Sequence, residues 1–179
     1  MNGMQDKVRS LWVPLREMNL LLPNVAVAEI SSYRVPRHCE GMPEWFLGMV
    51  PWREQEIPVI SLESVCGLTV PSNPVFSRLM IVNSVNPESP LKHFAIVTAG
   101  LPGLIQFGGD TADEVVDNSF DGLKCIVRIG SEEAVIPDLP YVQGLLETCL
   151  ADVAGSKNGG YLKSPHNVCV AARAGSAAV

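Results

Sequence analysis

Short apolar runs separated by proline and glycine are the feature that most limits the folds open to this chain. From residue 11 to about residue 148, turn signals recur roughly every 8 to 15 residues, and the runs between them have the length of β-strands. Strands of about five residues are typical of small barrels. The sequence therefore predicts a mostly β fold, with strands at residues 11–16, 20–22, 25–30, 46–52, 57–60, 78–83, 92–98, 104–107, 123–129 and 134–136.

Helical signals are confined to two segments. Residues 62–65 form one short turn that Gly67 ends, and a longer helix begins after Asp138, a good N-cap residue. Its apolar residues recur at spacings of three and four, as on one face of a helix: Leu139, Val142, Leu145, Leu146 and Cys149. Small and flexible residues follow, so we expect a domain at residues 1–150 and a flexible tail at residues 151–179.

The chain contains an internal repeat. Residues 46–62 and 120–139 both read Phe-x-Gly, apolar strand, arginine, glutamate, second apolar strand and leucine, about 75 residues apart. Two similar β units, each too small to be stable alone, would account for this order, although any two β-hairpins share some of it. The alignment pairs Gly48 with Gly122 and Arg53 with Arg128.

Composition and charge exclude several classes of protein. With 47% hydrophobic and 18% charged residues, the chain is not disordered over its whole length. The 13 basic against 19 acidic side chains give a net charge of −6, which argues against a nucleic-acid partner. Since no apolar run is long enough to span a bilayer and no signal core precedes the domain, we expect a cytoplasmic protein without membrane insertion.

The cysteines favour neither a metal site nor a disulfide framework. Cys39, Cys66, Cys125, Cys149 and Cys169 lack the close pairs that zinc sites use, and their number is odd. We interpret them as reduced, mostly buried thiols. His38 beside Cys39, and His166 near Cys169, each supply only two ligands, so we expect no metal and no cofactor.

Signatures of catalysis are absent from the sequence. There is no Gly-x-Ser-x-Gly elbow and no Gly-Lys-Ser/Thr phosphate loop, and His93 falls within an expected strand, where we interpret it as a packed or surface residue. An acidic stretch at residues 110–121 lacks the order of a calcium loop, so we interpret it as a solvated connection. We therefore expect a protein that is not an enzyme.

The segment from Trp45 to Arg53 is rich in groups that dominate binding interfaces. Trp buries a large rigid surface and Arg presents a planar fork of five donors, which makes both frequent at hot spots. The other interpretation is that Trp45 and Trp52 belong to the core and that Arg53 only ends a strand.

Two segments carry a resemblance to a known family. Val27-Ala28-Glu29-Ile30 is followed by GMVPWREQEIPVISLESVCG at residues 48–67. This order resembles the CheW-like family of chemosensory adaptor domains, whose pattern is Val-x-Glu-Ile, Gly-x-x-x-x-Arg, Pro-Val-Ile-x-Leu and a final Gly. The resemblance extends over about residues 8–150, and its matching residues are Val27, Glu29, Ile30, Gly48, Arg53, Pro58, Val59, Ile60, Leu62 and Gly67.

The resemblance implies both a fold and a role. The fold would be two similar five-stranded SH3-like β-barrel subdomains, intertwined, with a short C-terminal helix. The role would be a non-catalytic adaptor that couples a methyl-accepting chemoreceptor tip to a histidine kinase of the CheA type, recruited to receptor arrays at the membrane.

The partner-binding residues follow from the matched positions. The groove between the barrels would use Val27, Glu29, Ala95, Gly100 and Leu104, and Gly48 and Arg53 would belong to the same partner-binding surface. Trp52 is added from its chemistry alone.

Departures from the family pattern point to a divergent member. Glu54 stands where a glycine usually follows the arginine, and Thr98-Ala99 replaces a usual Val-Asp pair. The chain is similar to the ChpC kind of accessory adaptor in type IV pilus chemosensory systems, which drive twitching motility.

Two other classes stay open. One is a small β-barrel enzyme or ligand-binding module that binds a flavin or uses Cys39 or Cys66 as a reactive thiol. The other is a module that docks on the kinase without a receptor.

Overall fold

A computed structural model of the chain describes residues 7–68, 76–108, 114–117 and 120–155. The first part of the chain contains β1 (Val8–Pro14), β2 (Asn19–Pro23), η1 (Asn24–Ala26), β3 (Val27–Ser32), β4 (Phe46–Trp52), β5 (Gln55–Ile60) and α1 (Leu62–Val65). The second part contains β6 (Arg78–Asn83), β7 (His93–Thr98), β8 (Gly103–Phe107), β9 (Glu114–Asp117), β10 (Leu123–Ile129), β11 (Glu132–Pro137) and α2 (Leu139–Gly155). The mostly β fold class is confirmed.

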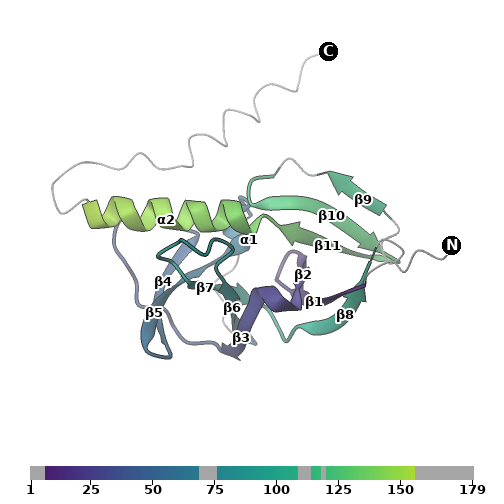
Figure 1. Ribbon diagram of the computed structural model, residues 1–179, viewed down its shortest axis with the longest axis horizontal. Coiled ribbons are helices and arrows are strands. Elements are labelled where there is room, and N and C mark those ends of the chain that lie inside the picture. Colours follow the sequence, from purple (N-terminus) through teal and green to yellow (C-terminus); the bar gives the residue numbers. More distant parts are fainter. Residues whose placement is uncertain (1–6, 69–75, 109–113, 118–119, 156–179) are drawn as a thin grey trace, which may run out of the picture.

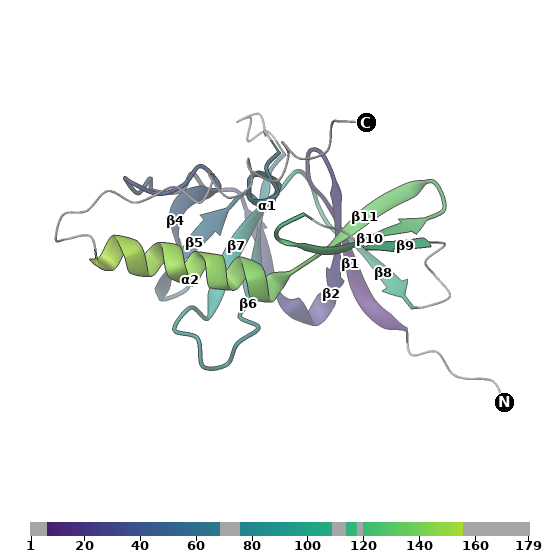
Figure 2. The ribbon, with the colours of Figure 1, turned by 90° about the horizontal axis from the view of Figure 1, so that it is seen from above.

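Two sheets stand side by side, and α2 runs along the second of them (Figures 1 and 2). The first sheet has the order β8-β1-β2-β11-β10-β9, and the second has the order β3-β6-β7-β5-β4. The second sheet closes toward a barrel through the bridge between Arg37 and Met49 at its β4 edge. The expected SH3-like pair of β units is therefore present, and the first unit carries β9 as a sixth strand.

The acidic stretch is not only a connection. Glu114–Asp117 forms the edge strand β9 and pairs with β10, so the interpretation of a continuous solvated loop is wrong over these residues. Valines at positions 115 and 116 supply the strand preference that the flanking carboxylates concealed. Asp110 and Asp113 lie outside the described residues.

Both sheets are assembled by the same rule. In each sheet, two antiparallel hairpins are joined through their second strands, which pair in parallel. These parallel pairs are β11 with β2 in the first sheet and β5 with β7 in the second. In each sheet, the strand that follows the hairpin β1-β2 or β6-β7 in the chain joins the opposite sheet. Thus β3 follows β2 but pairs with β6, and β8 follows β7 but pairs with β1.

The internal repeat is real, but its alignment differs from the one that the sequence suggested. The hairpin β4-β5 followed by α1 corresponds to β10-β11 followed by α2, with a constant offset of 77 residues between Phe46 and Leu123 and between Leu62 and Leu139. Both hairpins carry a register shift near their start. The true counterparts are therefore Gly48 with Cys125 and Arg53 with Gly130.

Side chains of the second sheet are buried on both faces. Along β6, Met80 and Val82 face the core shared with α2, whereas Leu79 and Ile81 face the interior of the second barrel. Successive side chains of a strand point to opposite faces, so a strand that is buried on both faces has an unbroken apolar run. The expected burial of the segment around Met80 on both faces is confirmed.

The helix α2 starts as the sequence predicts. The Asp138 carboxylate accepts a hydrogen bond from the Tyr141 amide at 3.1 Å, and Leu139, Val142 and Leu146 are buried against the main core. The helix continues to Gly155, so residues 151–155 are helical rather than part of a flexible tail. Residues 156–179, the remainder of the expected tail, lie outside the described residues.

Glu63 at the start of α1 provides a test of stability against pH. Its side chain is only 4% exposed, and its Oε1 accepts a hydrogen bond from the Glu17 amide at 2.7 Å. Burial raises the pKa of this carboxyl above 4.5, with the nearby Glu17 acting in the same direction and the amide bond opposing it. The folded state therefore holds this proton at pH values where the unfolded state has lost it.

We expect the free energy of unfolding to fall as pH rises from about 4.5 through the raised pKa of Glu63. Glu63→Gln keeps an acceptor for the Glu17 amide and cannot ionise, so this contribution to the slope should disappear and the variant should gain stability relative to the wild type at neutral pH. Urea denaturation across this pH range measures the effect. Parallel profiles for the two proteins would contradict the assignment.

Candidate functional site

The turn between β4 and β5 holds an arginine in a conformation that favours glycine. Arg53 has φ 52°, and its counterpart between β10 and β11 is Gly130, with φ 62°. A left-handed backbone costs a side-chain-bearing residue free energy that glycine does not lose. The second barrel therefore keeps an arginine where the first uses the less strained residue.

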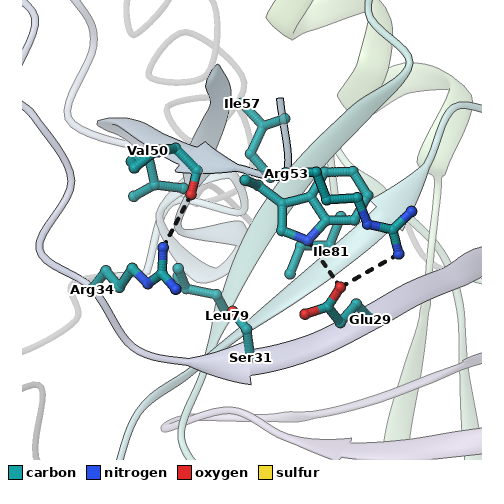
Figure 3. A pocket seen from close by; sticks show the side chains of 10 residues that line it. Glu29, Ser31, Arg34, Val50, Arg53, Ile57, Leu79 and Ile81 are labelled. Atoms are coloured by element: carbon teal, nitrogen blue, oxygen red, sulfur yellow. Dashed lines mark hydrogen bonds and ion pairs between the residues drawn. The ribbon is translucent and has the colours of Figure 1, made fainter. Parts of the chain in front are cut away.

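Arg53, Trp52 and Glu29 form one contact cluster, and Figure 3 labels Glu29 and Arg53. The indole Nε1 of Trp52 donates to Glu29 Oε2 at 3.0 Å, and the same oxygen lies 3.5 Å from Nη2 of Arg53. The guanidinium carbon of Arg53 stands 4.3 Å from the centroid of the Trp52 ring, within the range of a cation–π contact. Trp52 is 7% exposed, whereas the Arg53 side chain is 64% exposed.

His93 on β7 borders this cluster. Its ring centroid lies 4.7 Å from that of Trp52, and its Nδ1 is 3.1 Å from Nε2 of Gln55. Burial lowers the pKa of His93, and the positive charge of Arg53 lowers it further. The half-buried imidazole agrees with the expectation of a packed strand residue.

A pocket of about 150 Å³ opens beside the cluster. Its floor is made by core residues of the second barrel, Val50, Ile57, Leu79 and Ile81. Arg34 lies across the pocket from Arg53 in Figure 3, and its Nη1 donates to the Pro51 carbonyl at 3.3 Å. The site thus combines an apolar floor with charged groups at its rim.

Gly48 and Ala95 do not reach the surface. Ala95 is 0% exposed in the interior of the second barrel. At Gly48, φ is +132° and a Cβ would lie 2.3 Å from the Arg37 carbonyl oxygen, so the glycine allows residues 36–37 to pack on β4 and close the barrel. Both residues stand beneath the surface to which the sequence pattern assigned them.

The remaining expected residues take no part in the contacts of the cluster or in the lining of the pocket. Val27 begins β3 and is half-buried, Gly100 follows β7, and Leu104 on β8 is 63% exposed. Two further apolar residues near them in sequence are strongly exposed, Val25 at 83% and Leu101 at 70%. The structure therefore places Glu29, Trp52 and Arg53 in one cluster, and Val27, Gly100 and Leu104 outside it, near exposed apolar residues.

From the sequence we did not predict that Arg34 belongs to the site, or that His93 contacts Trp52 and Gln55 there. Arg34 follows β3 and reaches β4 only because residues 33–37 continue past the end of that strand to the Met49 bridge. A closure made by one isolated bridge has no periodic pattern in sequence.

The described cysteines, Cys39, Cys66, Cys125 and Cys149, are half-buried, whereas we expected mostly buried thiols from the sequence. Burial, with Glu63 and Asp121 nearby, raises the pKa of Cys66 to about 12, the opposite of what a reactive thiolate requires. Within the described ranges, no three His, Cys, Asp or Glu side chains group as metal ligands would. His166 and Cys169 lie outside those ranges, and none of the described helices is long and apolar enough to cross a membrane.

Known proteins share this fold. The sequence matches the family model of the CheW-like domain over residues 9–143, and no curated protein matches it. Among solved structures, the scaffolding protein TtCheW from Thermoanaerobacter tengcongensis is 16% identical, with a TM-score of 0.63 over 75% of this chain and 90% of that one. The family model spans well over half of the sequence, and the chain belongs to the CheW-like domain family.

Proposed function

We propose that this protein is a non-catalytic adaptor that couples a chemoreceptor tip to a histidine kinase of the CheA type in a chemosensory pathway. Membership of the CheW-like family supports a scaffolding role, and the similar solved structure is described as a scaffolding protein. The observation that carries the proposal is Arg53, which is exposed and stacked on Trp52 at a turn where the other barrel has glycine.

The proposed contact surface has two parts. Glu29, Trp52 and Arg53 form a rigid charged and aromatic face, since the buried Trp52 fixes the position of both partners. The exposed apolar side chains of Val25, Leu101 and Leu104, which are near Val27 and Gly100 in sequence, would contact the helical hairpin of a receptor. Gly48 and Ala95 would support these faces from beneath rather than contact a partner.

The output we propose is chemotaxis or, given the similarity to the ChpC kind of accessory adaptor, type IV pilus twitching motility. Glu54 is exposed in the turn beside Arg53, where it adds a negative charge to the proposed surface. The Ala99 amide donates to the Pro14 carbonyl at 2.9 Å, so this position ties the end of β7 to β1. A partner for this surface would have to accommodate the carboxylate of Glu54.

The test is affinity purification of receptor and kinase from the source organism with wild-type protein and Arg53→Ala. We expect Arg53→Ala to fold and to weaken partner binding by about 1 to 3 kcal/mol, the range of interface hot spots. Arg37→Ala is the matched control, because Arg37 is an exposed arginine that pairs with Glu56 outside the cluster.

A second variant separates the side chain from the backbone strain. Arg53→Gly removes the guanidinium and relieves the left-handed conformation, so it should be at least as stable as Arg53→Ala and bind equally weakly. An unfolded Arg53→Ala protein, or unchanged affinity for both partners, would contradict the proposal. Capture of the kinase alone would favour a module that acts on the kinase without a receptor.

A further inference from the structure

The pocket beside Arg53 has the properties of a ligand site in its own right. Its floor is apolar, since it is lined by Val50, Ile57, Leu79 and Ile81, which are each no more than 2% exposed. A volume of about 150 Å³ is enough for one aliphatic or aromatic group of the size of benzene. Ser31 lies at the edge of this volume on β3.

The rim of the pocket favours an anion. Arg34 and Arg53 line it together with one carboxylate, Glu29, which already accepts the Trp52 indole N–H and faces Arg53. Two guanidinium groups against one carboxylate leave a local excess of positive charge in a protein whose net charge is −6. Only one of the five donors of Arg34 bonds the Pro51 carbonyl, so its fork retains capacity for a carboxylate.

We propose that this pocket binds a small carboxylate with an aliphatic or aromatic body. The apolar body would rest on the floor formed by the core of the second barrel, and the carboxylate would meet the rim, with Arg34 as its main contact (Figure 3). An apolar cavity with a few converging polar groups is the usual form of a small-molecule site. Such a ligand gives the adaptor a chemical input of its own.

The readout is the indole N–H signal of Trp52 in the proton–nitrogen spectrum of the full chain, identified by its loss in Trp52→Phe. This group lines the pocket and bonds Glu29, so a bound carboxylate should change its shift. The probes are 3-methylbutanoate and benzoate at constant ionic strength. Their neutral amides have the same shape without the charge and should bind about tenfold more weakly.

Three variants locate the binding. Arg34→Gln should weaken carboxylate binding about tenfold through loss of a charge-assisted hydrogen bond. Arg37→Gln removes the same charge close by but outside the pocket, so its affinity should match the wild type. Ser31→Leu retains both arginines and places apolar atoms in the cavity, so the saturable shift should be lost.

Several results would overturn the inference. One such result is a shift that never saturates. Others are equal binding of the acids and amides, or equal weakening by Arg34→Gln and Arg37→Gln. Each would mean that the Trp52 signal does not report a carboxylate bound at Arg34. Binding that survives Ser31→Leu would lie elsewhere. Binding of a peptide with leucine beside glutamate, without binding of either free acid, would assign the pocket to a partner's side chain instead. The measurement uses the isolated chain, so it is independent of the proposed function.

Discussion

Substitution of Gly48 by alanine is expected to lower the free energy of unfolding by about 3 kcal/mol. The new Cβ would lie 2.3 Å from the Arg37 carbonyl oxygen and 2.8 Å from its carbonyl carbon, which are backbone atoms that cannot rotate away. In addition, φ of +132° is a conformation that alanine rarely adopts. Relief of the clash requires residues 36–37 to separate from β4 and open the second barrel.

Thermal unfolding measures this effect, with an expected decrease in Tm of about 6 to 12 °C for a chain of this size. Hydrogen exchange locates it, since the amides of Arg37 and Met49 bond each other's carbonyls at 2.8 and 3.0 Å and should lose protection. Gly144→Ala is the matched control, because a methyl group at Gly144 in α2 would meet no atom within 4 Å and the variant should gain up to about 1 kcal/mol. A Gly48→Ala protein as stable as the wild type would contradict the closure assigned to Gly48.

Truncation of Trp52 to alanine is the second substitution with a large expected effect. The side chain is 7% exposed and packs in the interior of the second barrel with Val50 and Ile57. Its removal should lower the free energy of unfolding by about 3 kcal/mol, toward the lower end for buried aromatic residues because the adjacent pocket admits water. Arg53 would also lose the ring on which it stacks.

Trp52→Phe separates packing from hydrogen bonding. Phenylalanine retains most of the apolar volume but cannot donate to Glu29, so we expect a loss of about 1 to 2 kcal/mol. Urea denaturation of Trp52→Phe, Glu29→Ala and the double variant gives the coupling between the two side chains, because each single variant removes one partner of the hydrogen bond. Additive losses would mean that the 3.0 Å hydrogen bond contributes nothing to stability.

Mostly apolar strands between clear turn signals were the easiest elements to predict from the sequence. Residues 46–52, 78–83 and 123–129 were predicted with their observed bounds, because each is a mostly apolar run between turn signals. Strands that begin with polar residues were predicted less completely. The observed β5 begins at Gln55 and β11 at Glu132, in each case two residues before the apolar run that marked the predicted strand. Polar residues beside a hairpin turn lengthen the paired strands without adding to the hydrophobic pattern by which a strand is recognised in the sequence.

The parts of the site that could not be predicted from the sequence depend on contacts between distant segments. Trp52 was chosen for its chemistry and Glu29 for the family pattern, but their hydrogen bond depends on the curvature that brings β3 over the end of β4. The same curvature buries Gly48 and Ala95, which a linear pattern cannot distinguish from surface positions. Likewise, the repeat was visible in the order of its residues, but only the strand register identifies Gly130 as the counterpart of Arg53.

The exchange of β3 and β8 between the sheets has a consequence for how the chain is divided. A cut between α1 and β6 would leave β1 and β2 of the first sheet, and β3, β4 and β5 of the second, on the N-terminal piece. Neither piece then holds a complete sheet, so neither half has a core that it can close alone. The two halves must acquire their structure in one cooperative transition, and the adaptor cannot lose one barrel while the other persists.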